Sequence, residues 1–160
     1  MSLQKFCAKP IVTVAPQQTI VEACRLLHDK NVGCLIVTEG GTLRGILTDR
    51  DIALKVIAEG KDPQETHVHD VMTANPAHIT MDKTVHDLTA LMHERHVRRV
   101  PIVDGGGLVV GLMTLDDLAV LLGQELADLG KGIAVALFSK PPTVDEPELV
   151  PPFGWLMSYL

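Results

Sequence analysis

Aromatic residues are scarce in this chain of 160 residues, where three Phe, one Trp and one Tyr make up 3% of the sequence. A packed interior must therefore be built from Val, Leu, Ile, Ala and Met, and apolar residues of all kinds reach 46%. That share is enough for one ordinary domain or for two small units that share a core. The lack of aromatic stacking residues also argues against a nucleic-acid-binding surface.

Cysteine is rare as well. Cys7, Cys24 and Cys34 form an odd set without a CxxC pair, so a disulfide framework is not expected. Cys24 falls on the apolar side of a predicted helix and Cys34 in an apolar strand, and both are predicted to be small buried side chains. A reducing, cytoplasmic location fits this usage.

The chain has no basic excess and no long apolar run. Lys and Arg number 14 against 20 Asp and Glu, a net charge of -6, which argues against broad contact with a nucleic-acid backbone. Its longest apolar candidate, residues 133–138, is far shorter than the ~20 residues of a membrane span. The first residues also lack the apolar stretch of a secretion signal. We therefore expect no membrane partner and no nucleic-acid partner.

What the chain does contain is an internal repeat. Gly45-Ile46-Leu47-Thr48-Asp49-Arg50-Asp51 matches Gly111-Leu112-Met113-Thr114-Leu115-Asp116-Asp117, an offset of 66 positions. Leu35-Ile36-Val37 falls on Pro101-Ile102-Val103 at the same offset, whereas Thr19-Ile20 matches Thr84-Val85 at an offset of 65. The change of offset predicts one extra residue between Val97 and Pro101.

Each copy predicts the same order of elements. A short extended segment leads to Thr19 or Thr84, which are predicted helix N-caps, and then to an amphipathic helix. A strand, a glycine turn and a second strand follow. Glycine is expected in the turn because tight hairpins need residues with positive φ. Thr48 or Thr114 then opens a second helix whose first-turn acids suit the helix dipole. The order predicts an α+β fold of two pseudo-twofold related units, each a three-stranded sheet with two helices.

The predicted domain bounds are 5–66 for the first repeat, 67–128 for the second and 129–160 for a C-terminal tail. This tail is rich in proline and holds Trp155 and Tyr159, the chain's single Trp and Tyr. Because apolar side chains are costly to leave in water, we expect the tail to dock on a partner protomer or on the repeat pair. A detachable partner-binding peptide and a disordered end are the alternatives.

The doubled Gly-Ile-Leu-Thr-Asp-Arg-Asp and Gly-Leu-Met-Thr-Leu-Asp-Asp pattern resembles the cystathionine-β-synthase (CBS) domain family over about residues 5 to 128. Val97-Arg98-Arg99-Val100-Pro101-Ile102-Val103 also resembles that family's second-repeat strand. The resemblance implies a tandem pair, or Bateman module, that forms a homodimer and binds adenosine-containing ligands in two clefts. AMP, ADP and ATP are the expected ligands, with S-adenosylmethionine and NAD as weaker candidates.

By this resemblance, Asp51 and Asp117 would accept hydrogen bonds from ribose, and Thr48 and Thr114 would contact ribose or phosphate. Backbone near four further positions would frame the adenine: Val14, Leu35, Thr80 and Pro101. A carboxylate suits two neighbouring hydroxyls, and a helix start is a natural anion site, so the chemistry is reasonable without the family.

The two copies differ in their cations. Arg98 and Arg99 can neutralise a phosphate, and Arg50 could reach the same region, whereas Gly33-Cys34 takes the place of the arginine pair in the first copy. The Arg98-Arg99 cleft is therefore expected to prefer phosphorylated ligands. A plainer interpretation makes the threonines helix caps, the aspartates dipole partners and the arginines a solvated strand edge.

Neither a metal site nor an active site is predicted. His67-x-His69 and His93-Glu94-Arg95-His96 lack the spacing of a closed ligand set, and no nucleophile is paired with a base. The leading hypothesis is a regulatory sensor that is not an enzyme and acts on an unknown effector protein in trans. The alternative is a constitutive dimerisation or scaffold module with no bound nucleotide.

Overall fold

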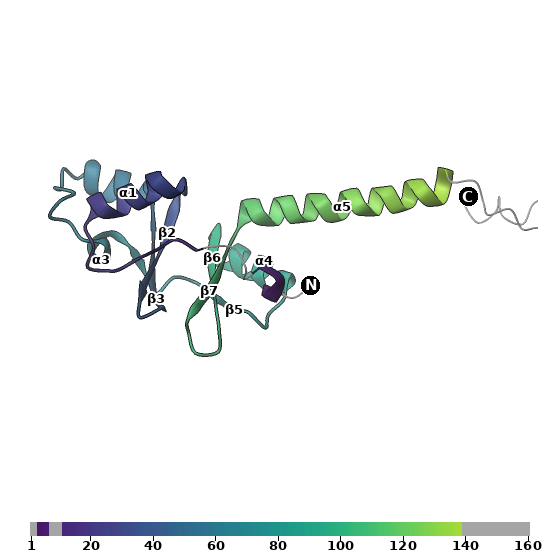
Figure 1. The fold of residues 1–160 in the computed structure, drawn as a ribbon, viewed down its shortest axis with the longest axis horizontal. Helices are drawn as coiled ribbons and strands as arrows, with labels where there is room; N and C mark the ends of the chain where they lie inside the picture. Colours follow the sequence, from purple (N-terminus) through teal and green to yellow (C-terminus); the bar gives the residue numbers. More distant parts are fainter. Residues whose placement is uncertain (1–2, 7–10, 139–160) are drawn as a thin grey trace, which may run out of the picture. The chain divides into compact units, whose positions relative to one another are not determined.

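The computed structural model describes residues 3–6 and 11–138 (Figure 1). A first compact unit, Met1–Val120, holds both repeats, and helix α5 continues into a second unit that begins at Leu121. The elements of the first repeat and its connection are η1 (Leu3–Phe6), β1 (Thr13–Val14), α1 (Ile20–Lys30), β2 (Cys34–Glu39), β3 (Thr42–Thr48), α2 (Asp49–Ile52), the π-helix η2 (Ala53–Ile57), α3 (Val68–Val71) and β4 (Thr73–Ala74). Those that follow are β5 (Ile79–Thr80), α4 (Val85–Arg95), β6 (Arg99–Val103), β7 (Val109–Thr114) and α5 (Leu115–Phe138).

The predicted threonine caps at the start of α1 and α4 are confirmed. Thr19 accepts a hydrogen bond from the Glu22 N–H, while the Glu22 carboxylate accepts one from the Thr19 N–H. Thr84 and Asp87 form the same capping box in the second repeat. Such boxes satisfy two N–H groups that the first turn of a helix leaves open, and so they fix where each helix begins.

The expected mixed α+β fold is confirmed, with a larger first sheet than the three strands predicted. Its strand order is β1-β2-β3-β4, against β5-β6-β7 in the second sheet. The fourth strand comes from the connection between the repeats and pairs with Gly45 and Ile46 of β3. A Cβ on Gly45 would collide with the Met72 side chain and approach the Thr73 carbonyl, so the motif glycine makes room for this connection.

Strand register corrects the position of the extra residue in the second copy. Cys34 pairs with Thr48, and Arg99 pairs with Thr114, so β2 corresponds to β6 at an offset of 65 rather than 66. Leu35 therefore matches Val100, not Pro101. The extra residue lies in the β6–β7 hairpin instead of between Val97 and Pro101, because a turn absorbs an insertion without breaking the ladder.

Each repeat completes its core with a segment from elsewhere in the chain. Val68 and Val71 of α3, which follow the first repeat, are buried with α1, β2 and α2 in the first core. Leu3, at the other end of that repeat, is fully buried in the second core, and its N–H donates to the Lys83 carbonyl. The two repeats are thus interlocked at their ends.

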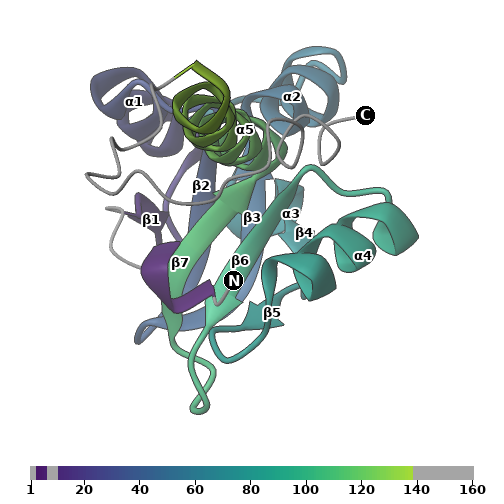
Figure 2. The same ribbon diagram turned by 90° about the vertical axis from the view of Figure 1, so that its right-hand side faces the viewer.

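The β2–β3 and β6–β7 hairpins lie next to each other (Figures 1 and 2). A third apolar cluster joins the two sheets there. Cys34, Ile36 and Ile46 are buried there, and Val109 and Leu112 of the second repeat pack against them. The two hairpins are also joined at their turns by backbone hydrogen bonds, from the Leu43 N–H to the Gly107 carbonyl and from the Val109 N–H to the Gly41 carbonyl. Each sheet therefore has helices on one face and the other sheet on its second face.

Two expectations about single side chains differ in outcome. Cys34 is buried as predicted, but the prediction for Cys24 is wrong, because its side chain is exposed beside α2. Docking of the C-terminal tail concerns mostly residues 139–160, which lie outside the described residues. No helix in the described part of the chain combines the length and apolar character needed to cross a membrane.

We expect Leu3→Ala to destabilise the second repeat although residue 3 precedes the first. Truncating a fully buried leucine costs about 2–5 kcal/mol, whereas the matched change Leu54→Ala, at a half-exposed side chain, should cost less than about 0.5 kcal/mol. Urea unfolding of the two variants measures both values. Equal stability of Leu3→Ala and the wild type would contradict the burial of Leu3 in the second core.

Candidate functional site

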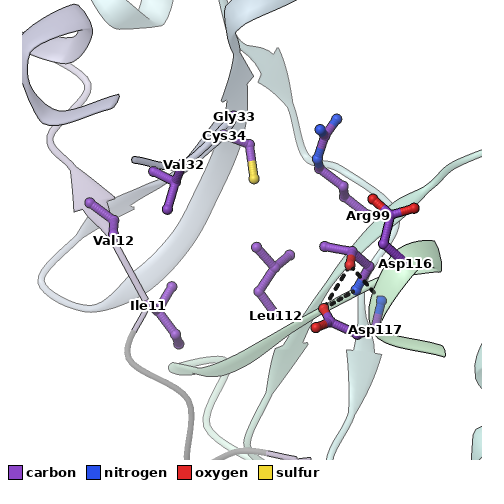
Figure 3. A pocket seen from close by; sticks show the side chains of 10 residues that line it. Ile11, Val12, Val32, Gly33, Cys34, Arg99, Leu112, Asp116 and Asp117 are labelled. Carbon is purple, nitrogen blue, oxygen red and sulfur yellow. Dashed lines mark hydrogen bonds between the residues drawn. The ribbon is translucent and has the colours of Figure 1, made fainter. Parts of the chain in front are cut away.

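The pocket that carries the candidate chemistry lies between the repeats and encloses about 330 Å³. Its apolar wall combines Ile11, Val12 and Val32 of the first repeat with Leu112 of β7, and Gly33 and Cys34 add the start of β2 (Figure 3). Its polar wall comes from the second repeat: Arg99, Thr114, Asp116 and Asp117. Specific ligand pockets have this composition, apolar with a few converging polar groups.

The predicted Thr114 and Asp117 meet at the start of α5. The Asp117 carboxylate accepts hydrogen bonds from the Thr114 N–H at 3.1 Å and from its hydroxyl at 2.6 Å, and the Asp117 N–H donates to that hydroxyl at 3.1 Å. The same capping box forms from Thr48 and Asp51. Capping therefore explains both pairs locally, and it also holds each carboxylate at a fixed place beside a helix N-terminus.

The arginine pair is divided between two surfaces. Arg99 is half-buried in the pocket, and its guanidinium reaches across to Gly33 of the first repeat, within 3.5 Å of where a Cβ would stand. Arg98 is 74% exposed, lies 3.9 Å from Asp116 and lines a separate groove with His93 and His96. Neighbouring residues of an extended segment point to opposite sides, so Arg98 and Arg99 serve different surfaces.

Asp51 differs from Asp117 in having a lysine one turn later. The Lys55 ammonium lies 2.7 Å from Asp51 Oδ1 and donates to the Val71 carbonyl at 2.8 Å. Burial raises the pKa of the Asp51 carboxyl, but the hydrogen bonds from Lys55 and Thr48 outweigh it, so the pKa lies below its ordinary value. Lys55 thus connects the first Thr–Asp pair to α3. In the second repeat the equivalent position, four residues after Asp117, is Leu121, which carries no charge.

The other predicted residues lie outside the lining of this pocket. Val14 and Leu35 are buried in the first core, and Pro101 is buried in β6. Arg50 is exposed, and the Thr80 hydroxyl donates to Asp82, lowering the pKa of that carboxyl. Sequence reasoning missed Ile11, Val12, Val32, Leu112 and Asp116 as pocket residues, although Leu112 and Asp116 lie inside the repeated motif.

The histidine groups noted in the sequence form ring pairs. The rings of His67 and His69 stack with their centroids 5.6 Å apart, and those of His93 and His96 meet edge to face with centroids 6.4 Å apart. Asp70 lies 3.2 Å from His69 Nε2, while the Pro16 carbonyl lies 2.9 Å from His69 Nδ1. Among the residues that the structure describes, no group of three or more His, Cys, Asp or Glu side chains could hold a metal ion.

We expect the free energy of unfolding to depend less on acidic pH in Asp51→Asn than in the wild type. A carboxyl whose pKa is lowered by folding stabilises the native state above its unfolded pKa of about 3.9, and this stability is lost as pH falls through the folded value. Between about pH 5 and pH 2, the free energy of unfolding should therefore fall more steeply in the wild type than in Asp51→Asn. Urea titrations across this range test it, and parallel curves would contradict the Lys55–Asp51 pairing.

The comparisons with known proteins agree with this architecture. A family model described as CBS domain matches residues 3–58 and 68–123. The CBS domain-containing protein YhcV of Bacillus subtilis is 46% identical over 119 residues, which are 74% of this chain and 84% of that protein. Protein MK0525 of Methanopyrus kandleri is 31% identical over 119 residues, again 74% of this chain but 61% of its own length.

Solved structures give the same result. The CBS-domain containing protein ATU1752 from Agrobacterium tumefaciens has a TM-score of 0.65 at 28% identity, covering 74% of this chain and 97% of that chain. The CBS domain pair of protein MJ0100, in complex with 5'-methylthioadenosine and S-adenosyl-L-methionine, has a TM-score of 0.68 at 31% identity, covering 78% and 98%. With two matched domains, their shared motifs and this fold, the chain belongs to the CBS domain family.

Proposed function

We propose that this chain is a regulatory module that binds an adenosine-containing ligand in the pocket between its two repeats. The observation that carries the proposal is the convergence of Arg99, Thr114 and Asp117 on one pocket whose apolar wall comes mainly from the first repeat. An adenine ring suits the apolar wall, and a ribose suits a fixed carboxylate. The MJ0100 pair, in complex with two adenosine compounds, supports the class of ligand.

The proposed contacts follow from the geometry of the polar wall. The Thr114 N–H and hydroxyl both donate to Oδ2 of Asp117 and hold this carboxylate at the pocket, and a carboxylate is an acceptor that suits the two hydroxyls of a ribose diol. Arg99, on the opposite strand, offers paired N–H donors for a phosphate or a carboxylate on the ligand. The ligand would thus contact both repeats at once.

The charge of the polar wall bears on the choice among adenosine compounds. Two carboxylates, Asp116 and Asp117, accompany one guanidinium. AMP places one phosphate on Arg99, whereas the added charges of ADP and ATP would meet the acids. S-Adenosylmethionine, which carries a cationic sulfur, is favoured by the same acids. We therefore propose ligands with at most one phosphate in this pocket, ahead of ADP and ATP.

Regulation would follow from the pocket's position. A ligand that contacts both sheets can shift their packing by as much as its affinity differs between two arrangements. Grooves at equivalent places on the repeats, one beside Ile57 and the other beside Leu115, leave apolar side chains exposed and fit a homodimer. That homodimer, an effector protein in trans and a cytoplasmic location stay predictions, as do the domain bounds and the absence of catalysis.

We expect Asp117→Asn to weaken S-adenosylmethionine or AMP binding by about 10- to 100-fold, because hydrogen bonds to charged groups contribute about 1.5–3 kcal/mol. Asp51→Asn is the matched control, and it should change affinity by less than about twofold although it breaks the Lys55 pair. Isothermal titration calorimetry of the full chain gives both values. Failure of the wild type to bind any adenosine compound would overturn the proposed function and favour the scaffold alternative.

A second pair of variants separates the two arginines. Arg99→Ala should weaken AMP binding by at least about tenfold while adenosine binding changes little, because only AMP presents a charge to the guanidinium. Arg98→Ala should leave both affinities close to the wild type, since Arg98 lines another groove and its 3.9 Å contact with Asp116 joins two exposed side chains, which makes it weak. Equal losses for AMP and adenosine in Arg99→Ala would exclude phosphate recognition by this residue.

A further inference from the structure

Helix α5 carries a row of exposed aliphatic side chains that the three apolar clusters of the repeats do not include. Leu122, Leu126, Leu129 and Ile133, which we name the α5 stripe, are 53%, 69%, 61% and 50% exposed. At 3.6 residues per turn these four positions fall within a narrow arc of the helix surface. No charged residue interrupts the arc, so the stripe is a continuous apolar face.

The composition of α5 indicates that this face is covered when the protein functions. Gly123, Gly130 and Gly132 each cost a helix about 1 kcal/mol relative to alanine, and helices of this kind gain most of their stability from packing. A Cβ added at any of the three glycines would meet nothing within 4 Å. The low helix propensity of these glycines therefore favours a helix that is stabilised by packing, and the space beside the stripe is open.

The spacing of the stripe favours a second copy of the same helix. Its intervals are four, three and four residues, a pattern that reads identically in both directions. An antiparallel copy related by a twofold axis between positions 127 and 128 would place Leu122 opposite the partner's Ile133 and Leu126 opposite the partner's Leu129. Such self-complementarity is what a twofold interface requires.

The charges along α5 select the antiparallel direction. The acids Asp116, Asp117, Glu125 and Asp128 all precede residue 129, and residues 129–138 contain a single charge, Lys131. A parallel pair would stack the acids of both helices against one another. Lys131 is paired with Asp128 of its own helix at 2.9 Å. An antiparallel pair instead sets Asp117 and Glu125 beside residues 129–138 of the other helix, which carry no further acid, so the distribution of the acids favours the same direction as the spacing.

We propose that the α5 stripe is an interface between two copies of this chain, formed by antiparallel pairing of their α5 helices. The pairing does not depend on ligand, and it is separate from the groove contacts of the proposed homodimer. It would give each assembly of the repeat pair a second means of association.

Sedimentation of the full chain tests the pairing. Leu126→Lys places an ammonium opposite the partner's Leu129, and it should halve the wild-type mass and raise the dissociation constant at least about 100-fold. Val135→Lys is the matched control, because Val135 is 63% exposed on the opposite side of the helix. It should keep the wild-type mass. A monomeric wild type, an unchanged mass in Leu126→Lys, or an equal loss in Val135→Lys would overturn the interface.

The double variant Leu126→Lys/Leu129→Glu tests direction. In the antiparallel register each Lys faces the partner's Glu, so the wild-type mass should return, whereas a parallel pair would set like charges together. A double variant that stays at half mass would overturn the antiparallel register. Circular dichroism and thermal unfolding of every variant confirm that the repeats are folded, so that a change in mass reports association and not unfolding.

Discussion

The packing of the two hairpins against each other is the constraint on which the rest of the structure depends. A three- or four-stranded sheet with helices on one side leaves its second face exposed, and neither repeat can cover that face alone. Ile36 and Ile46 are buried in a cluster to which the second repeat contributes Val109 and Leu112. The candidate pocket is a direct result, since it lies beside this contact and takes its walls from both repeats.

Much of the fold could be predicted from the chain alone, and the exceptions have physical causes. Thr19 and Thr84 predict the starts of their helices because a capping box is a local interaction between residues three positions apart. The apolar residues of the strands are compatible with either offset, so the sequence does not locate the inserted residue, and the pairing of Arg99 with Thr114 fixes the register. The burial of Leu3 in the second core is a contact over a long sequence separation, for which no local signal exists.

The candidate site shows the same division. Thr114 and Asp117 follow from the repeated motif, and Arg99 from its position before a strand. Strand alternation alone could have separated Arg98 from Arg99, because consecutive residues point to opposite sides. The salt bridge from Lys55 to Asp51 could also have been predicted from the sequence, because the two residues are four positions apart on a helix. Repeats of similar sequence therefore need not give equivalent sites: one aspartate is tied to a lysine, and the other stands in a pocket.

The interlocked ends affect how the chain can be made. Leu3 is synthesised before either repeat hairpin, yet the core that receives it needs Leu118 and is complete only after the second repeat has been synthesised. At typical synthesis rates Leu3 must wait on the order of ten seconds for its binding place. α3, in contrast, emerges directly after the core that it closes. The first repeat can thus fold during translation, while the second is completed by a residue synthesised well before it.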